Sequence, residues 1–153
     1  MILKPLKFSV LLFSILLLFQ ACKDDCEQQA RFTPPTNFIF ELVDKTTKEN
    51  LFTNQTFSPI EMRVVNVDDS TAIDFDFIDE DDLNHIQIVG IGWETEKVNA
   101  LLRVGDKDIA NLRVDAERKS EDCCAFTEYN EIKIENADFQ LNAETGVYTV
   151  FVD

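Results

Sequence analysis

Carboxylates are the most numerous side chains in this sequence that could do chemistry, and eight of them gather between residues 68 and 82. The cluster consists of Asp68, Asp69, Asp74, Asp76, Asp79, Glu80, Asp81 and Asp82. Calcium takes about six to eight oxygen ligands, so four successive carboxylates at positions 79–82 could supply several of them. An EF-hand is excluded, because its loop needs a glycine at the sixth position and Phe75 and Phe77 interrupt the ligand positions. Two interpretations stay open, a calcium site at positions 79–82 and a solvated turn.

No motif in the chain points to catalysis. His85 is the only histidine, and no Gly-x-Ser-x-Gly nucleophile elbow is present. The spacing of the carboxylates does not establish the geometry that a paired-carboxylate glycosidase requires. Trp93, the only tryptophan, follows Gly90 and Gly92 and could either stack on a sugar ring or pack at an edge of the fold. We therefore predict no catalytic residues and expect a protein that is not an enzyme.

The first 21 residues have the pattern of an export signal. Lys4 and Lys7 precede an apolar run at residues 8–19 that only serines interrupt. Twelve helical residues rise about 18 Å, which is well short of the roughly 30 Å hydrocarbon core of a bilayer. This segment is therefore expected to be a cleaved signal peptide and not a transmembrane helix.

The sequence that follows resembles two short signals of bacterial lipoproteins. Residues 18–22 read Leu-Phe-Gln-Ala-Cys and resemble a relaxed lipobox, which implies that Cys22 is lipidated and becomes the first residue of the mature chain. Lys23, Asp24 and Asp25 resemble the export signal of surface lipoproteins in bacteria of the Bacteroidota type. The resemblance implies an outer-membrane lipoprotein that is exposed at the cell surface. The run from Asp69 to Thr71 resembles the O-glycosylation acceptors of exported proteins in the same bacteria, which implies a sugar on Ser70.

Three further cysteines offer one disulfide. Cys123 and Cys124 are poorly placed to pair with each other, because consecutive Cα atoms lie about 3.8 Å apart and disulfides prefer about 4.4–6.8 Å. In an oxidising compartment we expect Cys26 to pair with one of the two, and which one stays open. The remaining thiol is expected to be buried and inert, with pairing to another chain or redox activity as alternatives. A zinc site lacks its usual ligand spacing, and the Cys-x-x-Cys motif of thioredoxin-like proteins is absent.

The charge of the chain limits its partners. Lys and Arg number 14 and Asp and Glu number 29, which gives a net charge of −15. Removal of residues 1–21 would take away two lysines and no acid, so the mature chain would carry −17. Nucleic acid is excluded as a partner, because its recognition requires a basic surface. The same charge opposes self-association, and we expect a monomer that the acyl chains on Cys22 hold at the membrane.

Residues 37–153 read as short β-strands separated by polar turns. Eight runs are rich in β-branched and aromatic residues, and none shows a sustained helical period, although residues 97–104 are the most ambiguous. The runs lie at residues 38–43, 60–67, 73–77, 86–91, 98–104, 109–114, 132–134 and 147–152. Pro34 and Pro35 end a polar stretch that favours an extended tether over residues 22–36. The pattern predicts an all-β domain, an antiparallel sandwich of about seven or eight strands behind the signal peptide.

Two stretches resemble known families. Residues 40–52, FELVDKTTKENLF, resemble the first hairpin of prealbumin-like carboxypeptidase-regulatory modules, and residues 145–153, TGVYTVFVD, resemble their last strand. Residues 112–136 resemble small uncharacterised lipoproteins of the same bacteria. These resemblances imply an immunoglobulin-like or prealbumin-like sandwich and carry no activity.

The sequence thus predicts a lipid-anchored lipoprotein of the cell envelope with a non-catalytic sandwich. Its expected role is to bind or scaffold an envelope protein or a glycan. The alternative is a calcium-dependent carbohydrate-binding accessory module, and calcium is the only cofactor that the sequence suggests.

Overall fold

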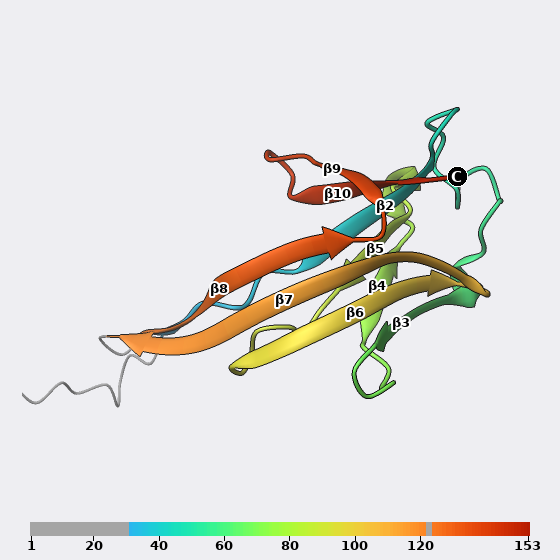
Figure 1. Ribbon diagram of the computed structural model, residues 1–153. Coiled ribbons are helices and arrows are strands. Elements are labelled where there is room, and N and C mark those ends of the chain that lie inside the picture. Colours follow the sequence, from blue (N-terminus) through green and yellow to red (C-terminus); the bar gives the residue numbers. More distant parts are fainter. Residues whose placement is uncertain (1–30, 122–123) are drawn as a thin grey trace, which may run out of the picture.

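Two five-stranded β-sheets make up the molecule. The computed structural model describes residues 31–121 and 124–153, in which sheet A has the strand order β1-β8-β7-β6-β3 and sheet B the order β4-β5-β2-β10-β9 (Figure 1). The prediction of an all-β sandwich is therefore confirmed. Among the described residues, none of the helical segments has the length and apolar character to span a membrane.

Eight of the ten strands overlap the predicted runs, and β1 and β9 were not predicted. Sheet A consists of β1 (Arg31–Phe32), β3 (Met62–Asn66), β6 (Glu96–Val104), β7 (Lys107–Glu121) and β8 (Cys124–Glu135). Sheet B consists of β2 (Phe38–Asp44), β4 (Phe75–Ile78), β5 (His85–Ile88), β9 (Asp138–Leu141) and β10 (Val147–Val152). Two single-turn 3-10 helices, η2 (Pro59–Glu61) and η3 (Glu80–Asp82), lie in the connections. The ambiguous residues 97–104 are strand.

The core forms where alternate side chains of the two sheets meet. Phe38, Phe40 and Leu42 of β2 are at most 1% exposed and belong to one apolar cluster with Leu102 of β6 and Leu112 of β7. Because successive side chains on a strand point to opposite faces, this spacing of two residues places all three β2 side chains on the inner face. Full burial of one such side chain contributes about 1.5–3 kcal/mol to folding, which makes β2 a central element of the sandwich.

Strand pairing is antiparallel except at two places. Strand β2 pairs in parallel with β10 over six residues, from Ile39 opposite Val147 to Asp44 opposite Val152. Strand β1 pairs in parallel with β8 through two residues, with Phe32 opposite Ala125. The second pairing brings the start of the described chain to the end of the β7–β8 hairpin.

The β7–β8 hairpin is much longer than the two runs that predicted it. Strand β7 has 15 residues and β8 has 12, and the register shifts between Asp115 and Ala116. The sequence did not reveal the outer part of the hairpin, because residues 117–121 are polar or charged and lack an apolar alternation. This part of the hairpin is covered by residues 33–36 and by the loop before β6. Thr33 donates its N–H to Ala125, and Thr36 donates its N–H to the Tyr129 hydroxyl.

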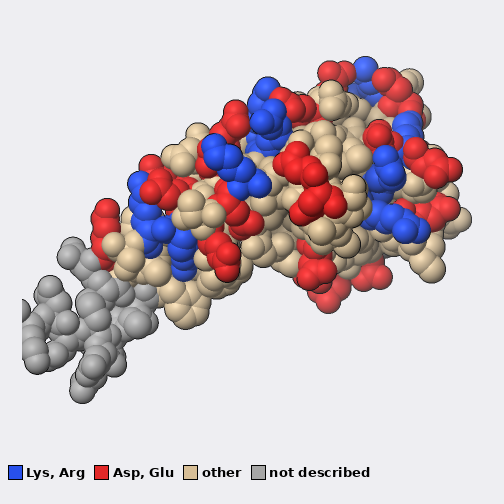
Figure 2. Space-filling view, turned by 60° about the horizontal axis from the view of Figure 1, so that its bottom comes forward, with Lys and Arg blue, Asp and Glu red and all other residues tan. Residues whose placement is uncertain are grey.

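The outward face of sheet A carries ion pairs between neighbouring strands. The Lys97 ammonium lies 2.7 Å from the Asp115 carboxylate, and its hydrogen bond lowers the pKa of Asp115 below the ordinary value of 3.8. Lys119 lies 2.5 Å from Glu128 across the β7–β8 pair. Figure 2 shows basic and acidic side chains interspersed over one face of the molecule. On this face the two signs of charge alternate, and neither forms a uniform patch.

Candidate functional site

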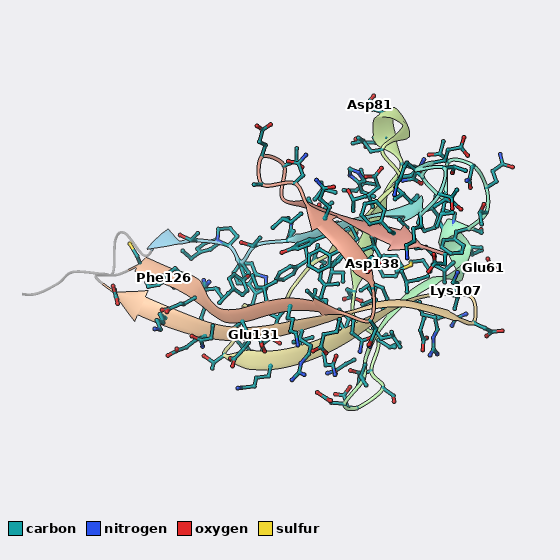
Figure 3. The ribbon with its side chains drawn as sticks, turned by 45° about the horizontal axis from the view of Figure 1, so that its top comes forward. Glu61, Asp81, Lys107, Phe126, Glu131 and Asp138 are labelled. Carbon is teal, nitrogen blue, oxygen red and sulfur yellow. The ribbon has the colours of Figure 1, made fainter. Side chains whose placement is uncertain are left out.

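The acidic residues at positions 79–82 lie on an exposed tip at η3. Asp79, Glu80 and Asp81 are exposed, and Asp81 stands in the left-handed region with φ 53°. Asp81 points away from the body of the molecule in Figure 3. Among the described side chains, which do not include Asp82, no group of three or more His, Cys, Asp or Glu residues is placed to share a metal ion. The calcium site therefore stays a prediction, and the described carboxylates do not form a ligand set that supports it.

We expect the melting temperature of the chain to be the same in excess calcium chloride and in excess EDTA. An ion bound only to the folded state stabilises it by RT ln(1 + [L]/Kd), or about 2.7 kcal/mol at one hundred times Kd. The exposed carboxylates of η3 offer no assembled ligand set that would produce such a gain. Thermal unfolding followed by circular dichroism checks this. A higher melting temperature in calcium that the variant D79N/D81N abolishes would restore the calcium interpretation.

Ser70 lies at the tip of the turn between β3 and β4. Ser70 is exposed and has φ 61°, and its backbone N–H donates to the Asn66 carbonyl. Asp69 accepts hydrogen bonds from the backbone N–H and the hydroxyl of Thr71, and these bonds lower the pKa of Asp69. The serine is thus accessible, as a glycosylation site must be, and the modification itself stays a prediction.

The other predicted residues divide between the described and undescribed parts of the chain. Cys124 starts β8 as a free and exposed cysteine, so the expected bridge is absent at that residue, and so is the burial expected of a free thiol. His85 is half-buried on β5 and has Ile78 as its cross-strand neighbour. The remaining predicted residues lie outside the described residues: Cys22, Lys23, Asp24, Asp25, Cys26 and Cys123.

A group of two aromatic rings and one arginine is the most developed surface feature near the start of the described chain. Phe32 is 64% exposed and Trp93 is 48% exposed, and their ring centroids lie 6.0 Å apart. The guanidinium carbon of Arg118 lies 5.4 Å from the centroid of the Trp93 ring, within the range of a cation–π contact. We call Phe32, Trp93 and Arg118 the aromatic–arginine surface. Its members come from β1, the loop before β6, and β7.

Hydrogen bonds hold the arginine of this surface in place. One terminal nitrogen of Arg118 donates to the Thr33 carbonyl at 3.0 Å and to the Thr127 hydroxyl at 2.8 Å. The backbone N–H of Arg118 donates to the Thr95 hydroxyl at 3.0 Å. The guanidinium is therefore held by Thr33, which follows β1, and by Thr127 of β8, and it retains further N–H groups that can donate to a ligand.

Gly92 fixes the loop that presents Trp93. The Gly92 N–H donates to the Glu96 carboxylate at 2.6 Å, and the Gly92 carbonyl accepts from the Thr127 hydroxyl at 2.6 Å. Gly92 has φ +98°, and a Cβ atom built on it would lie 2.9 Å from the Thr127 methyl carbon and 3.0 Å from the Tyr129 hydroxyl oxygen. Only glycine fits this position without strain, so the loop and the exposed indole are held against the β7–β8 hairpin.

This arrangement offers the contacts of a binding surface. Exposed aromatic rings offer apolar contact, and an ordered arginine adds directed hydrogen bonds, the combination found at the centre of many recognition surfaces. No histidine, cysteine or serine nucleophile belongs to the aromatic–arginine surface. The sequence singled out Trp93 but missed Phe32 and Arg118, because the strand register alone brings these distant residues together.

Comparison of the chain with protein-family models, with curated proteins and with solved structures gave no match. The fold is an all-β sandwich whose described surface carries two exposed aromatic rings beside an ordered arginine.

Proposed function

We propose that the chain is a lipid-anchored lipoprotein of the outer membrane, exposed at the cell surface. Its non-catalytic sandwich binds or scaffolds an envelope partner through the aromatic–arginine surface. The acyl chains on Cys22 hold it at the membrane, and Lys23, Asp24 and Asp25 direct its export. The proposal is supported by the signals in the sequence and by the position of the surface relative to them.

The position of Phe32 is the observation that carries the proposal. Phe32 belongs to the aromatic–arginine surface and follows Cys22 by ten residues. Ten extended residues span at most about 36 Å, so a lipid on Cys22 would keep the surface within that distance of the membrane. Components of the envelope close to the membrane are therefore the partners within reach.

A disulfide between Cys26 and Cys123 is part of the proposal. Strand β1, which begins at Arg31, pairs with β8 at the free Cys124, so the start of the described chain lies beside the outer part of the β7–β8 hairpin. In the chain-entropy model, a bridge that closes a loop of about 100 residues contributes at most roughly 4.7 kcal/mol. The bridge would join the tether to the hairpin beside the aromatic–arginine surface.

The intact mass of the protein extracted from its native membrane tests the anchor and the bridge together. We expect a mass that begins at Cys22 and includes acyl chains. Alkylation before reduction should modify one thiol, Cys124, and alkylation after reduction should modify three. Added hexose-sized increments would support a sugar on Ser70. A mass that begins at Cys22 without acyl chains would contradict the lipid anchor, and three thiols alkylated before reduction would contradict the bridge.

A further inference from the structure

Two apolar side chains of β9 face the interior of the sandwich and are nevertheless exposed. Phe139 is directly opposite Val150 of β10, and Leu141 is directly opposite Tyr148. Residues that are directly opposite on neighbouring strands share a face of the sheet, and Val150 is fully buried in the core. Phe139 and Leu141 therefore lie on the core face of sheet B, yet they are 42% and 47% exposed. The described part of sheet A thus leaves a large share of both side chains open to solvent.

Strand β8 shows the same mismatch in sheet A. Ile132 is opposite Val114, which is 2% exposed and belongs to the core, while Ile132 itself is 42% exposed. Within the described residues, the outer neighbour of β8 is β1, which pairs only with Cys124 and Ala125. The part of β8 that contains Ile132 thus has a free backbone edge.

Strand β9 and the part of β8 that contains Ile132 lie on the same side of the molecule. Only two residues connect the end of β8 at Glu135 to the start of β9 at Asp138, so the strands leave one sheet and enter the other at this side. Figure 1 shows the β9–β10 hairpin above β8. Strand β9 is the outermost strand of sheet B in the described chain, so its second backbone edge is unpaired. We call Ile132, Phe139, Leu141 and the adjoining edges of β8 and β9 the open side.

The open side has the properties of a site for one more strand. A row of backbone N–H and C=O groups at the spacing of a β-strand is matched by another polypeptide backbone, which pairs with each group in turn. Inward-facing apolar groups at positions 139 and 141 require apolar side chains at alternate positions of the added strand. Addition of an extended peptide to a sheet edge is an established mode of recognition.

The net charge of the chain favours one kind of peptide. The chain carries −15, and Glu131 and Glu144 near the open side are exposed, whereas the exposed Asp138 is already paired with Lys45 at 2.9 Å. Asp138 and Glu131 are labelled on β9 and β8 in Figure 3. A second copy of the chain would bring the same negative charge to the interface, whereas a basic segment would complement it.

We propose that β9 accepts an extended segment of a basic polypeptide as an additional strand of sheet B. Alternate apolar side chains of this segment cover Phe139, Leu141 and Ile132, and its basic side chains face the surrounding carboxylates. The site is distinct from the aromatic–arginine surface and does not depend on the lipid anchor, so either proposal can fail while the other holds.

A synthetic peptide of alternating valine and lysine residues tests the proposal on the full chain in detergent. A second peptide of the same composition, with its valines and lysines in separate blocks, controls for charge. At about 0.15 M salt, where distant charges are screened, we expect the alternating peptide to bind at least about tenfold more tightly than the block peptide. We also expect it to slow amide hydrogen exchange at residues 138–141.

Two variants locate the binding. L141K places a positive charge on the open side and should lower the affinity for the alternating peptide by about tenfold or more. I60S removes an apolar side chain that is 88% exposed at η2 and should leave binding unchanged. Both residues are exposed, so neither variant should unfold the chain.

Four results of the peptide experiments would overturn the proposal. They are absence of binding, equal binding of the two peptides, binding that L141K does not weaken, and binding without added protection at residues 138–141. Slow amide hydrogen exchange at residues 138–141 in the free chain that becomes fast on dilution would identify a second copy as the occupant. Slow exchange that becomes fast only when residues 22–30 are deleted would identify the chain's own N-terminal segment. Either of these results would also overturn the proposal.

Discussion

Replacing Cys22 with alanine is expected to reduce incorporation of a lipid label into the chain to background. A thioether-linked diacylglycerol requires the cysteine sulfur, and an alanine offers no atom to acylate. Each buried methylene contributes about 0.8 kcal/mol to membrane binding, and stable anchoring takes two or more chains. The remaining chain would carry a large negative charge that anionic lipids repel, so the variant should also leave the outer-membrane fraction.

Metabolic labelling with an alkyne fatty acid, followed by membrane fractionation, measures both effects. The matched control is C26A, which removes a cysteine four residues further along and should keep the label and the membrane location. Label that persists in C22A, or that is lost in C26A, would contradict Cys22 as the acylated residue. A C22A chain that keeps its place in the outer membrane without label would show that another contact holds it there.

The sequence predicted the central strands well, because burial imposes an alternation that can be read directly. In β2 the side chains of Phe38, Phe40 and Leu42 are buried, and the residues between them are more polar or less buried. The same reasoning failed for β9, where all four residues are exposed and the run DFQL is too short to show a period. It also failed for β1, whose two residues become a strand only through pairing with β8.

The functional residues were harder to predict than the fold. Trp93 is unusual in composition alone, since it is the only tryptophan in the chain. Phe32 and Arg118 carry no such signal, and they join Trp93 because the β7–β8 hairpin extends far enough to meet β1 and the loop at Gly92. The acidic run at η3 left calcium and a solvated turn open as interpretations, and its described carboxylates do not converge. Composition alone does not distinguish a solvated run of repelling like charges from an assembled site.

Replacing Gly92 with alanine is expected to destabilise the folded chain by about 2–6 kcal/mol. A non-glycine residue in a sparsely populated backbone conformation costs about 1–3 kcal/mol, and φ at this position is +98°. The added methyl group would meet the Thr127 methyl carbon at 2.9 Å and the Tyr129 hydroxyl at 3.0 Å, and overpacking of this kind costs about 1–3 kcal/mol more. Urea unfolding followed by Trp93 fluorescence measures the free energy of unfolding and reports on the same loop.

Gly90 supplies a control that separates the two contributions. It lies two residues earlier in the same loop with φ +88°, but a Cβ atom built on it meets nothing within 4 Å. G90A should therefore show only the backbone cost of about 1–3 kcal/mol and should leave the native emission of Trp93 unchanged. G92A should cost more and should shift that emission, because the loop must move away from the hairpin that orients the indole. Equal destabilisation by the two variants would mean that the loop does not pack against Thr127 and Tyr129, and the aromatic–arginine surface would then lack the rigid support on which its role in binding rests.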